Sequence, residues 1–182
     1  MPPNRVALAI ATVGGVGLAP VAPGTFGSAA GVALHLLLGG LGPWLYLLTT
    51  LALLSVGIWA AEEAERVYGR RDDGRIVIDE VVGQWRVLLP LGPLGAGIGP
   101  GTWTAAGSLV LLVTGFVAFR CFDIAKPGPV AWAERRFEGG LGVMMDDVVA
   151  GALGAVVIVL VTFALASFGL VAADLFGMGG AA

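Results

Sequence analysis

The 182-residue chain has a single cysteine, Cys121, and a single histidine, His35. One cysteine cannot form a disulfide within the chain, and these two residues cannot supply the nitrogen and sulfur ligands of an ordinary zinc site. Charged residues make up only 13% of the chain, about half of their share in an ordinary soluble domain. With a net charge of -3 and no basic stripe, the sequence argues against a nucleic-acid partner.

Several familiar motifs of phosphate chemistry are also absent. A Cys-x5-Arg loop would need an arginine six residues after Cys121, where the chain has Pro127. The sequence contains no D-x-D-x-T aspartate nucleophile, and one histidine is too few for a phosphohistidine mechanism. No G-x-x-x-x-G-K-S/T loop is present, so the use of ATP is not indicated.

What the chain has in abundance is apolar sequence. Hydrophobic residues make up 57% of it, and the mean hydropathy is +0.91. Apart from Arg5 and Asp174, every acid and base lies between Glu62 and Asp147, so both flanking regions can enter a bilayer. The N-terminus lacks the order of regions found in a signal peptide. We therefore expect one membrane-embedded domain over residues 1–182, without room for a second domain.

The apolar segments predict an all-α, polytopic membrane bundle of about four to five helices. Segment 6–19 is glycine-rich and too short to span a bilayer, so we expect a re-entrant or interfacial piece. Thr25 or Ser28 is expected to cap the next helix, and Thr102 or Thr104 a later one. A glycine turn is expected at 139–142. The expected helices are 26–38, 44–61 with a polar extension to 68, 79–89, a segment from the threonine cap to 119, an amphipathic stretch 130–138, and a last membrane helix at about 147–173.

The uncharged turns predict how these helices are oriented. If the helices alternate in direction, turns 39–43 and 92–101 lie on one side of the membrane and all lysines and arginines on the other. By the positive-inside rule, the basic side faces the cytoplasm. Segments 19–28 and 119–130 are expected on that same side. The prediction is a multi-pass protein with a polar site at its cytoplasmic face.

Two acidic pairs stand out within apolar sequence. Asp79 and Glu80 lie in I-V-I-D-E-V-V-G-Q-W, and Asp146 and Asp147 in M-D-D-V-V-A-G, each pair followed by two valines. Burying an unpaired charge in a protein costs on the order of several kcal/mol of free energy, so such carboxylates need a partner. We expect both pairs at helix N-termini, where the helix dipole favours acids, and we interpret them as one site.

The residue types near these pairs indicate a particular chemistry. Four carboxylates, with Asp123 as a fifth, form a set of hard oxygen ligands suited to Mg²⁺. Arg120 and Lys126 add positive charge, and arginine fits phosphate oxygens well. Together they predict phosphoryl hydrolysis, in which the metal polarises the phosphoryl group while a carboxylate or the metal activates water.

Plainer interpretations stay open at this point. Each acidic pair alone fits ordinary helix-start charges, Arg120 fits a positive-inside anchor, and the A-P-G-T loop fits a simple turn. A small cation-transporting membrane protein and a non-enzymatic assembly subunit are the rival functional classes. A transporter predicts acids near the middle of a span facing a cavity, whereas the present topology puts them at helix ends.

Four segments carry a resemblance to a known family. A-P-G-T-F-G-S at 22–28, V-I-D-E-V-V-G-Q-W at 77–85, F-R-C-F-D-I-A-K-P-G-P at 119–129 and G-G-L-G-V-M-M-D-D-V-V-A-G at 139–151 resemble the motifs of phosphatidylglycerophosphatase A. They occur in order over about 14–151. Two features depart from the family pattern: Gly128 replaces a frequent bulky aromatic residue, and the turn before Asp79 is charged where histidine is frequent.

The resemblance implies an all-helical, Mg²⁺-dependent enzyme of the bacterial inner membrane. Such an enzyme removes the terminal phosphate of phosphatidylglycerophosphate to give phosphatidylglycerol in phospholipid synthesis; another membrane lipid phosphate stays an alternative substrate. By the same resemblance, the acidic pairs form the metal-binding and water-activating group, and no single base is assigned because such pairs titrate jointly. The implied site residues are Asp79, Glu80, Asp146 and Asp147 for metal and catalysis, Arg120, Asp123 and Lys126 for phosphate or the metal shell, and Gly24 and Thr25 for the phosphate loop.

Overall fold

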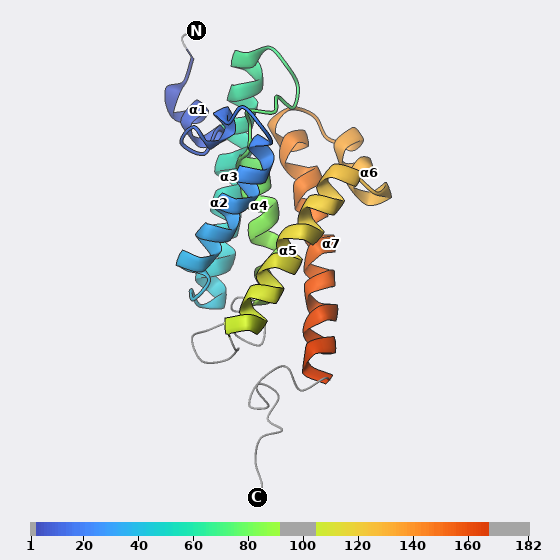
Figure 1. The fold of residues 1–182 in the computed structure, drawn as a ribbon. Helices are drawn as coiled ribbons and strands as arrows, with labels where there is room; N and C mark the ends of the chain where they lie inside the picture. The colour runs from blue at the N-terminus through green and yellow to red at the C-terminus, as the bar shows by residue number, and fades with distance from the viewer. Residues whose placement is uncertain (1–2, 92–104, 168–182) are drawn as a thin grey trace, which may run out of the picture.

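The computed structural model describes residues 3–91 and 105–167, and every regular element within these ranges is helical (Figure 1). The prediction of an all-α fold is therefore confirmed. The elements are α1 (Arg5–Ala11), η1 (Val16–Leu18), α2 (Pro23–Leu38), α3 (Pro43–Tyr68), α4 (Ile78–Val87), η2 (Leu89–Leu91), α5 (Ala105–Ala125), α6 (Gly128–Arg136) and α7 (Gly139–Ser167).

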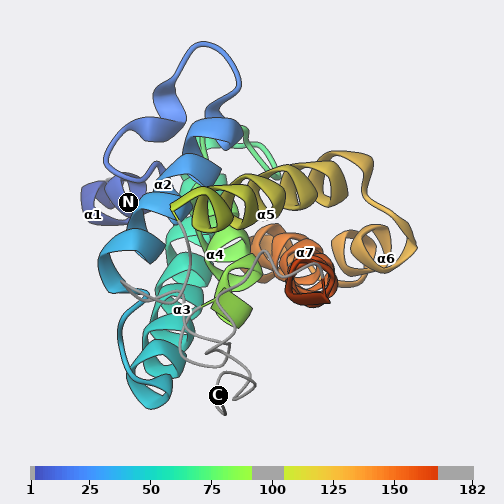
Figure 2. The same ribbon diagram turned by 60° about the horizontal axis from the view of Figure 1, so that its bottom comes forward.

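The short helix α4 is the centre of the bundle, with α2, α3, α5 and α7 around it (Figure 2). Glycines allow this close packing. A Cβ atom on Gly151 of α7 would lie 2.5 Å from the carbonyl oxygen of Gly83 in α4. A Cβ on Gly83 would lie 2.5 Å from the ring of Phe119 in α5. Small residues let helix backbones approach closely, so these two glycines fix α4 between α5 and α7.

Helix α2 begins earlier than the sequence predicts. It begins at Pro23, with Ala22 preceding it in a left-handed conformation at φ 47°, so neither Thr25 nor Ser28 caps it. Proline suits this first helical position because it has no backbone N–H, and an N–H at that position would have no acceptor within the helix. The Ser28 hydroxyl instead donates to the carbonyl oxygen of Gly24 at 2.9 Å. The expected threonine or serine cap is wrong, and α2 begins within the A-P-G-T segment.

Helix α7 also begins earlier, and this changes the position of an acidic pair. Gly139 starts it, so the expected glycine turn at 139–142 is helical and Asp146 lies about two turns into the helix rather than at its N-terminus. The Glu62 carboxylate of α3 accepts a hydrogen bond from the Gly140 N–H at 2.6 Å. This cap comes from a residue distant in sequence, which explains why the local pattern did not predict the start. The expected end at 173 lies outside the described residues.

Helix α5 continues past its expected end. It extends to Ala125, so Arg120 and Asp123 lie within its last turns instead of in a loop. Helix α6 agrees closely with the amphipathic stretch expected at 130–138. The expected threonine caps at 102 and 104 and the uncharged turn at 92–101 lie outside the described residues.

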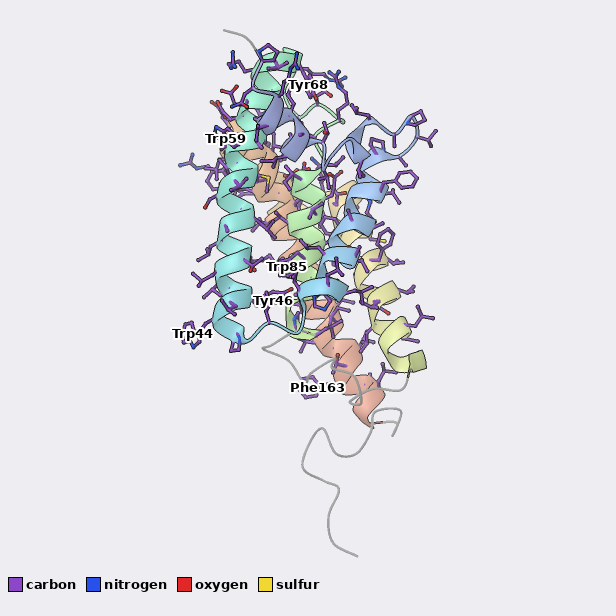
Figure 3. The ribbon with its side chains drawn as sticks, turned by 90° about the vertical axis from the view of Figure 1, so that its left-hand side faces the viewer. Trp44, Tyr46, Trp59, Tyr68, Trp85 and Phe163 are labelled. Atoms are coloured by element: carbon purple, nitrogen blue, oxygen red, sulfur yellow. The ribbon has the colours of Figure 1, made fainter. Side chains whose placement is uncertain are left out.

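Two of the described helices are long and apolar enough to cross a membrane: α3, and α7 over Gly139–Leu165. Only 22% of the most apolar 18-residue window is buried in each, so their apolar side chains face mostly outward. In Figure 3, Trp44 and Tyr68 lie at opposite ends of α3. The structure does not confirm the expected four to five spanning helices.

The polar segments gather at one end of the bundle, where α3 and α5 end, α2, α4 and α7 begin, and α6 lies (Figure 1). One basic residue departs from the expectation that all lie there. Arg86 is in the last turn of α4, and with Trp44 and Tyr46 it borders a mostly apolar cavity of about 290 Å³ toward the other end. The prediction was wrong for Arg86 because α4 carries it away from the polar end.

We expect Gly151→Ala to destabilise the bundle, because the new Cβ would press on the Gly83 carbonyl and push α7 away from α4. Overpacking of this kind typically costs roughly 1–3 kcal/mol. The measurement is the apparent melting temperature in detergent. Gly40→Ala is the matched control, since nothing lies within 4 Å of a Cβ at that position. Equal melting temperatures for the two variants would contradict the packing described above.

Candidate active site

Three carboxylates meet between α4 and α7. Asp79 and Glu80 lie in the first turn of α4, and Asp147 comes from α7. One carboxylate oxygen from each lies within 4.8 Å of the others. Asp79 and Asp147 are buried, and Glu80 is half-buried. The two acidic motifs therefore meet in the fold as expected, but of the second pair Asp147 alone joins the group.

Each of these carboxylates has an oxygen whose bonding capacity is unused. Asp79 Oδ1, Glu80 Oε2 and Asp147 Oδ2 are buried and accept no hydrogen bond from the described residues. In α4, which lies outside the two membrane-competent helices, burial raises the pKa of Asp79 well above its usual range, and Glu80 and Asp147 raise it further. Burial likewise raises the pKa of Glu80 to about 7. Burial therefore disfavours three negative charges here, and the three carboxylates could hold a cation that would stabilise their ionised forms.

Arg120 of α5 lies beside this group. Its Nη1 is 2.6 Å from Asp123 Oδ2 and 3.8 Å from Glu80 Oε1. The contact with Asp123 is an ion pair without hydrogen-bond geometry, and Arg120 Nε and Nη1 are buried with no acceptor among the described residues. Unused arginine donors therefore lie beside unused carboxylate oxygens. This arrangement suits an anion bound together with a cation.

Lys126 and Asp146 form a separate ionic contact at the edge of the site. The Lys126 ammonium donates to Glu134 Oε1 at 2.7 Å and to Asp146 Oδ2 at 2.9 Å. Asp146 Oδ1 accepts the Asp147 backbone N–H at 3.0 Å. Burial alone would lower the pKa of Lys126, but the two carboxylates outweigh it and raise that pKa above its usual range. Asp146 is thus occupied by Lys126 and does not join the group of three carboxylates.

Glu134 is a residue that sequence reasoning did not nominate. It lies on α6, and its carboxylate is the second partner of Lys126. The turn at Pro127 separates the two residues, so no helical spacing indicates the contact. The one available signal was the amphipathic pattern of 130–138, which places a charged face on this segment.

Gly24 lies directly against the site. A Cβ atom there would overlap Glu80 Oε1 and would lie 3.1 Å from Arg120 Nη1. Thr25 follows in the first turn of α2, half-buried, and its N–H donates to the Ala22 carbonyl at 2.9 Å. The N-terminus of a helix favours anions because of its dipole and free N–H groups. The first turn of α2 is therefore suited to a phosphate held by Arg120.

A polar cavity of about 590 Å³ opens on the other side of Asp146. Its charged lining comes from the loop before α4, from α6 and from α7. The residues that line it are Arg71, Asp72, Glu134, Arg135, Gly142, Val143 and Asp146. Asp146 and Glu134, the two partners of Lys126, thus border both this cavity and the edge of the site.

Comparison with known proteins assigns the chain to a family. The phosphatidylglycerophosphatase A family profile matches residues 9–162. Phosphatidylglycerophosphatase A of Escherichia coli strain K12 is 37% identical over 142 residues, covering 78% of this chain and 74% of that protein. The chain belongs to the phosphatidylglycerophosphatase A family. This confirms the resemblance carried by the four motifs.

Two further relatives carry different enzyme names, one of them phosphatidylglycerophosphatase A. The Haemophilus influenzae Rd protein of that name is 36% identical over 152 residues, covering 83% of each chain. A Bacteroides thetaiotaomicron protein, provisionally named a phosphatidylinositol-3-phosphatase, is 39% identical over 154 residues, covering 82% of this chain and 89% of its own. No solved structure matches this chain.

We expect Gly24→Ala to lower phosphatase activity by on the order of 10- to 100-fold, because the methyl group would displace the Glu80 carboxylate and crowd Arg120. The measurement is phosphate release from a lipid phosphomonoester by purified protein, with circular dichroism as the check on folding. Gly128→Ala serves as control, since a Cβ there meets nothing within 4 Å. Full activity in the Gly24 variant would show that this contact does not shape the site.

Proposed function

We propose that the protein is a Mg²⁺-dependent phosphatidylglycerophosphatase, which hydrolyses phosphatidylglycerophosphate to phosphatidylglycerol and phosphate in bacterial phospholipid synthesis. Membership of its family supports the reaction, that of a phosphoric monoester hydrolase. One structural observation carries the site assignment. Three buried carboxylate oxygens lie beside two buried arginine donors, and none of them has a hydrogen-bond partner in the part of the chain that the structure describes.

The donor set fits a hard divalent cation. Asp79, Glu80 and Asp147 would hold Mg²⁺, since it takes oxygen ligands and the unused oxygens lie on these residues. When bound, the ion stabilises the negative charge of the transferring phosphoryl group. Asp123 and Asp146, the other two candidate ligands, are engaged by Arg120 and Lys126. We therefore assign them to holding the basic residues rather than to direct metal contact.

The chain's own residues then divide the reaction among them. Arg120 binds the phosphate through its unused N–H donors, and the first turn of α2 with Gly24 and Thr25 lies behind it. A water oxygen bonds to phosphorus, and the bond from phosphorus to the glycerol oxygen breaks. One carboxylate of the acidic group takes the proton that the water loses, and the departing glycerol oxygen takes up a proton from the same group to leave as the alcohol. Lys126 fixes Asp146 and, through the Asp147 N–H, the position of Asp147.

We also propose a multi-pass arrangement in the bacterial inner membrane with the site facing the cytoplasm. The two membrane-competent helices and the outward-facing apolar side chains support it. So does the gathering of basic residues at the polar end of the bundle, because cytoplasmic loops are rich in lysine and arginine. Those residues are Arg66, Arg70, Arg71, Arg135 and Arg136.

A different lipid phosphate is the second candidate substrate, supported by the Bacteroides relative with a phosphoinositide name. A cation-transport function has less support. Asp79 and Glu80 lie where α4 begins, at the polar end of the bundle, and Asp147 lies about two turns into α7 rather than at the middle of that span. The presence of Arg120 in the same site also suits an anionic substrate better than a cation path.

We expect phosphate release to require a divalent cation and to stop with EDTA, because Arg120, the basic residue that the described structure places beside Glu80, carries one positive charge against three carboxylates. Asp79→Asn and Asp147→Asn should each lower kcat by on the order of 100-fold or more. The control is Glu63→Gln, which removes a surface acid whose ion pair with Arg66 lies outside the site. Turnover in EDTA, or near-normal rates in both aspartate variants, would contradict the proposed site.

A substrate panel tests the lipid assignment. Purified protein in detergent with Mg²⁺ is expected to favour phosphatidylglycerophosphate over phosphatidylinositol 3-phosphate and phosphatidic acid by at least about tenfold in kcat/KM, which corresponds to about 1.4 kcal/mol. Inorganic phosphate release is the readout. Preference for the phosphoinositide would favour the second candidate, and a lack of turnover on every lipid would overturn the proposed function.

A further inference from the structure

The outward face of α5 carries a shallow groove that reaches the active site. Its volume is about 410 Å³, and its residues recur at helical spacing, so they share one face of the helix. All of them except one are apolar or weakly polar. The lining residues are Phe116, Val117, Arg120, Cys121, Ile124 and Ala125.

Arg120 connects this groove to the catalytic carboxylates. Its side chain is 19% exposed, so it borders the groove while its Nη1 lies 3.8 Å from Glu80 and 2.6 Å from Asp123. Two of its nitrogens have no acceptor among the described residues. The same guanidinium therefore lies at the boundary between an apolar surface and the acidic group.

The polar cavity beside Asp146 and the α5 groove beside Arg120 differ in the chemistry of their lining residues. Five charged side chains, Asp146 among them, border the polar cavity. Arg120 is the one charged residue that lines the α5 groove. Val117 and Ile124 are 52% and 72% exposed in the isolated chain. A phospholipid has a phosphate group, which must reach the carboxylates, and acyl chains, which strongly favour an apolar surface. The groove offers that surface next to the arginine.

We propose that the acyl chains of the substrate lie along the α5 groove while its phosphate binds Arg120, so that the lipid enters the site sideways from the bilayer. This inference rests on the proposed lipid phosphatase function and adds the route and the acyl-binding surface.

The chain itself offers a sharp test, because its one cysteine is exposed and lines the groove. Purified protein is labelled at Cys121 with a maleimide that carries a polyethylene glycol chain, and each protein is compared with itself before labelling. We expect the rate on long-chain phosphatidylglycerophosphate to fall roughly tenfold, because the label occupies the path of the acyl chains. The rate on a dibutyryl analogue should change by less than about twofold, because short chains require little of the groove.

The matched control moves the thiol to another outward-facing apolar position. In Cys121→Ser/Leu160→Cys the label sits on α7, at a side chain that is 63% exposed, and should leave both labelled-to-unlabelled ratios near one. An unchanged long-chain rate after labelling of Cys121 would overturn the inference. So would an equal loss on both substrates, which would mean that the label disturbs the site itself. Phosphate release by unlabelled protein tests the proposed function separately.

Discussion

The central constraint on this structure is that three carboxylates lie together away from water. Within residues 3–91 and 105–167, Asp79, Glu80 and Asp147 each present a buried oxygen without a hydrogen-bond donor, and Arg120 presents buried donors without an acceptor. Neither set is balanced by the protein, and Arg120 is already paired with Asp123. A divalent cation bound together with a phosphate anion would balance both sets at once, which is why the proposed function links the electrostatics of the site to hydrolysis of a phosphate ester.

Helix packing makes this arrangement possible. Because Gly83 and Gly151 bring α4 and α7 into backbone contact, Asp147 reaches the first turn of α4. Gly24 does the same for the first turn of α2, which lies on Glu80 and Arg120. The glycines of these motifs therefore act through geometry, while the charged residues act through chemistry. A larger side chain at any of these glycines would separate the groups that must meet.

The sequence predicted the helical class from its apolar segments and the family from four motifs. It also predicted that the two acidic motifs meet, although Asp147 is the one residue of the second pair that joins Asp79 and Glu80. It did not predict where α7 begins, since Glu62 of α3 caps that helix from far away in the chain. For the same reason Asp146 was expected at a helix start, and its contact with Lys126 and Glu134 was not expected. Local patterns predict elements well, but contacts between distant elements decide which oxygens stay unpaired.

Direct measurement of cation binding tests the central claim most simply. Mn²⁺, used as a spectroscopic substitute for Mg²⁺, can be titrated into the purified protein and followed by electron paramagnetic resonance. The account predicts a saturable site in the unmodified protein that is lost in Asp147→Asn and kept in Glu63→Gln, whose acid lies on the surface. Equal binding by all three proteins, or no binding by any of them, would contradict a cation site formed by Asp79, Glu80 and Asp147.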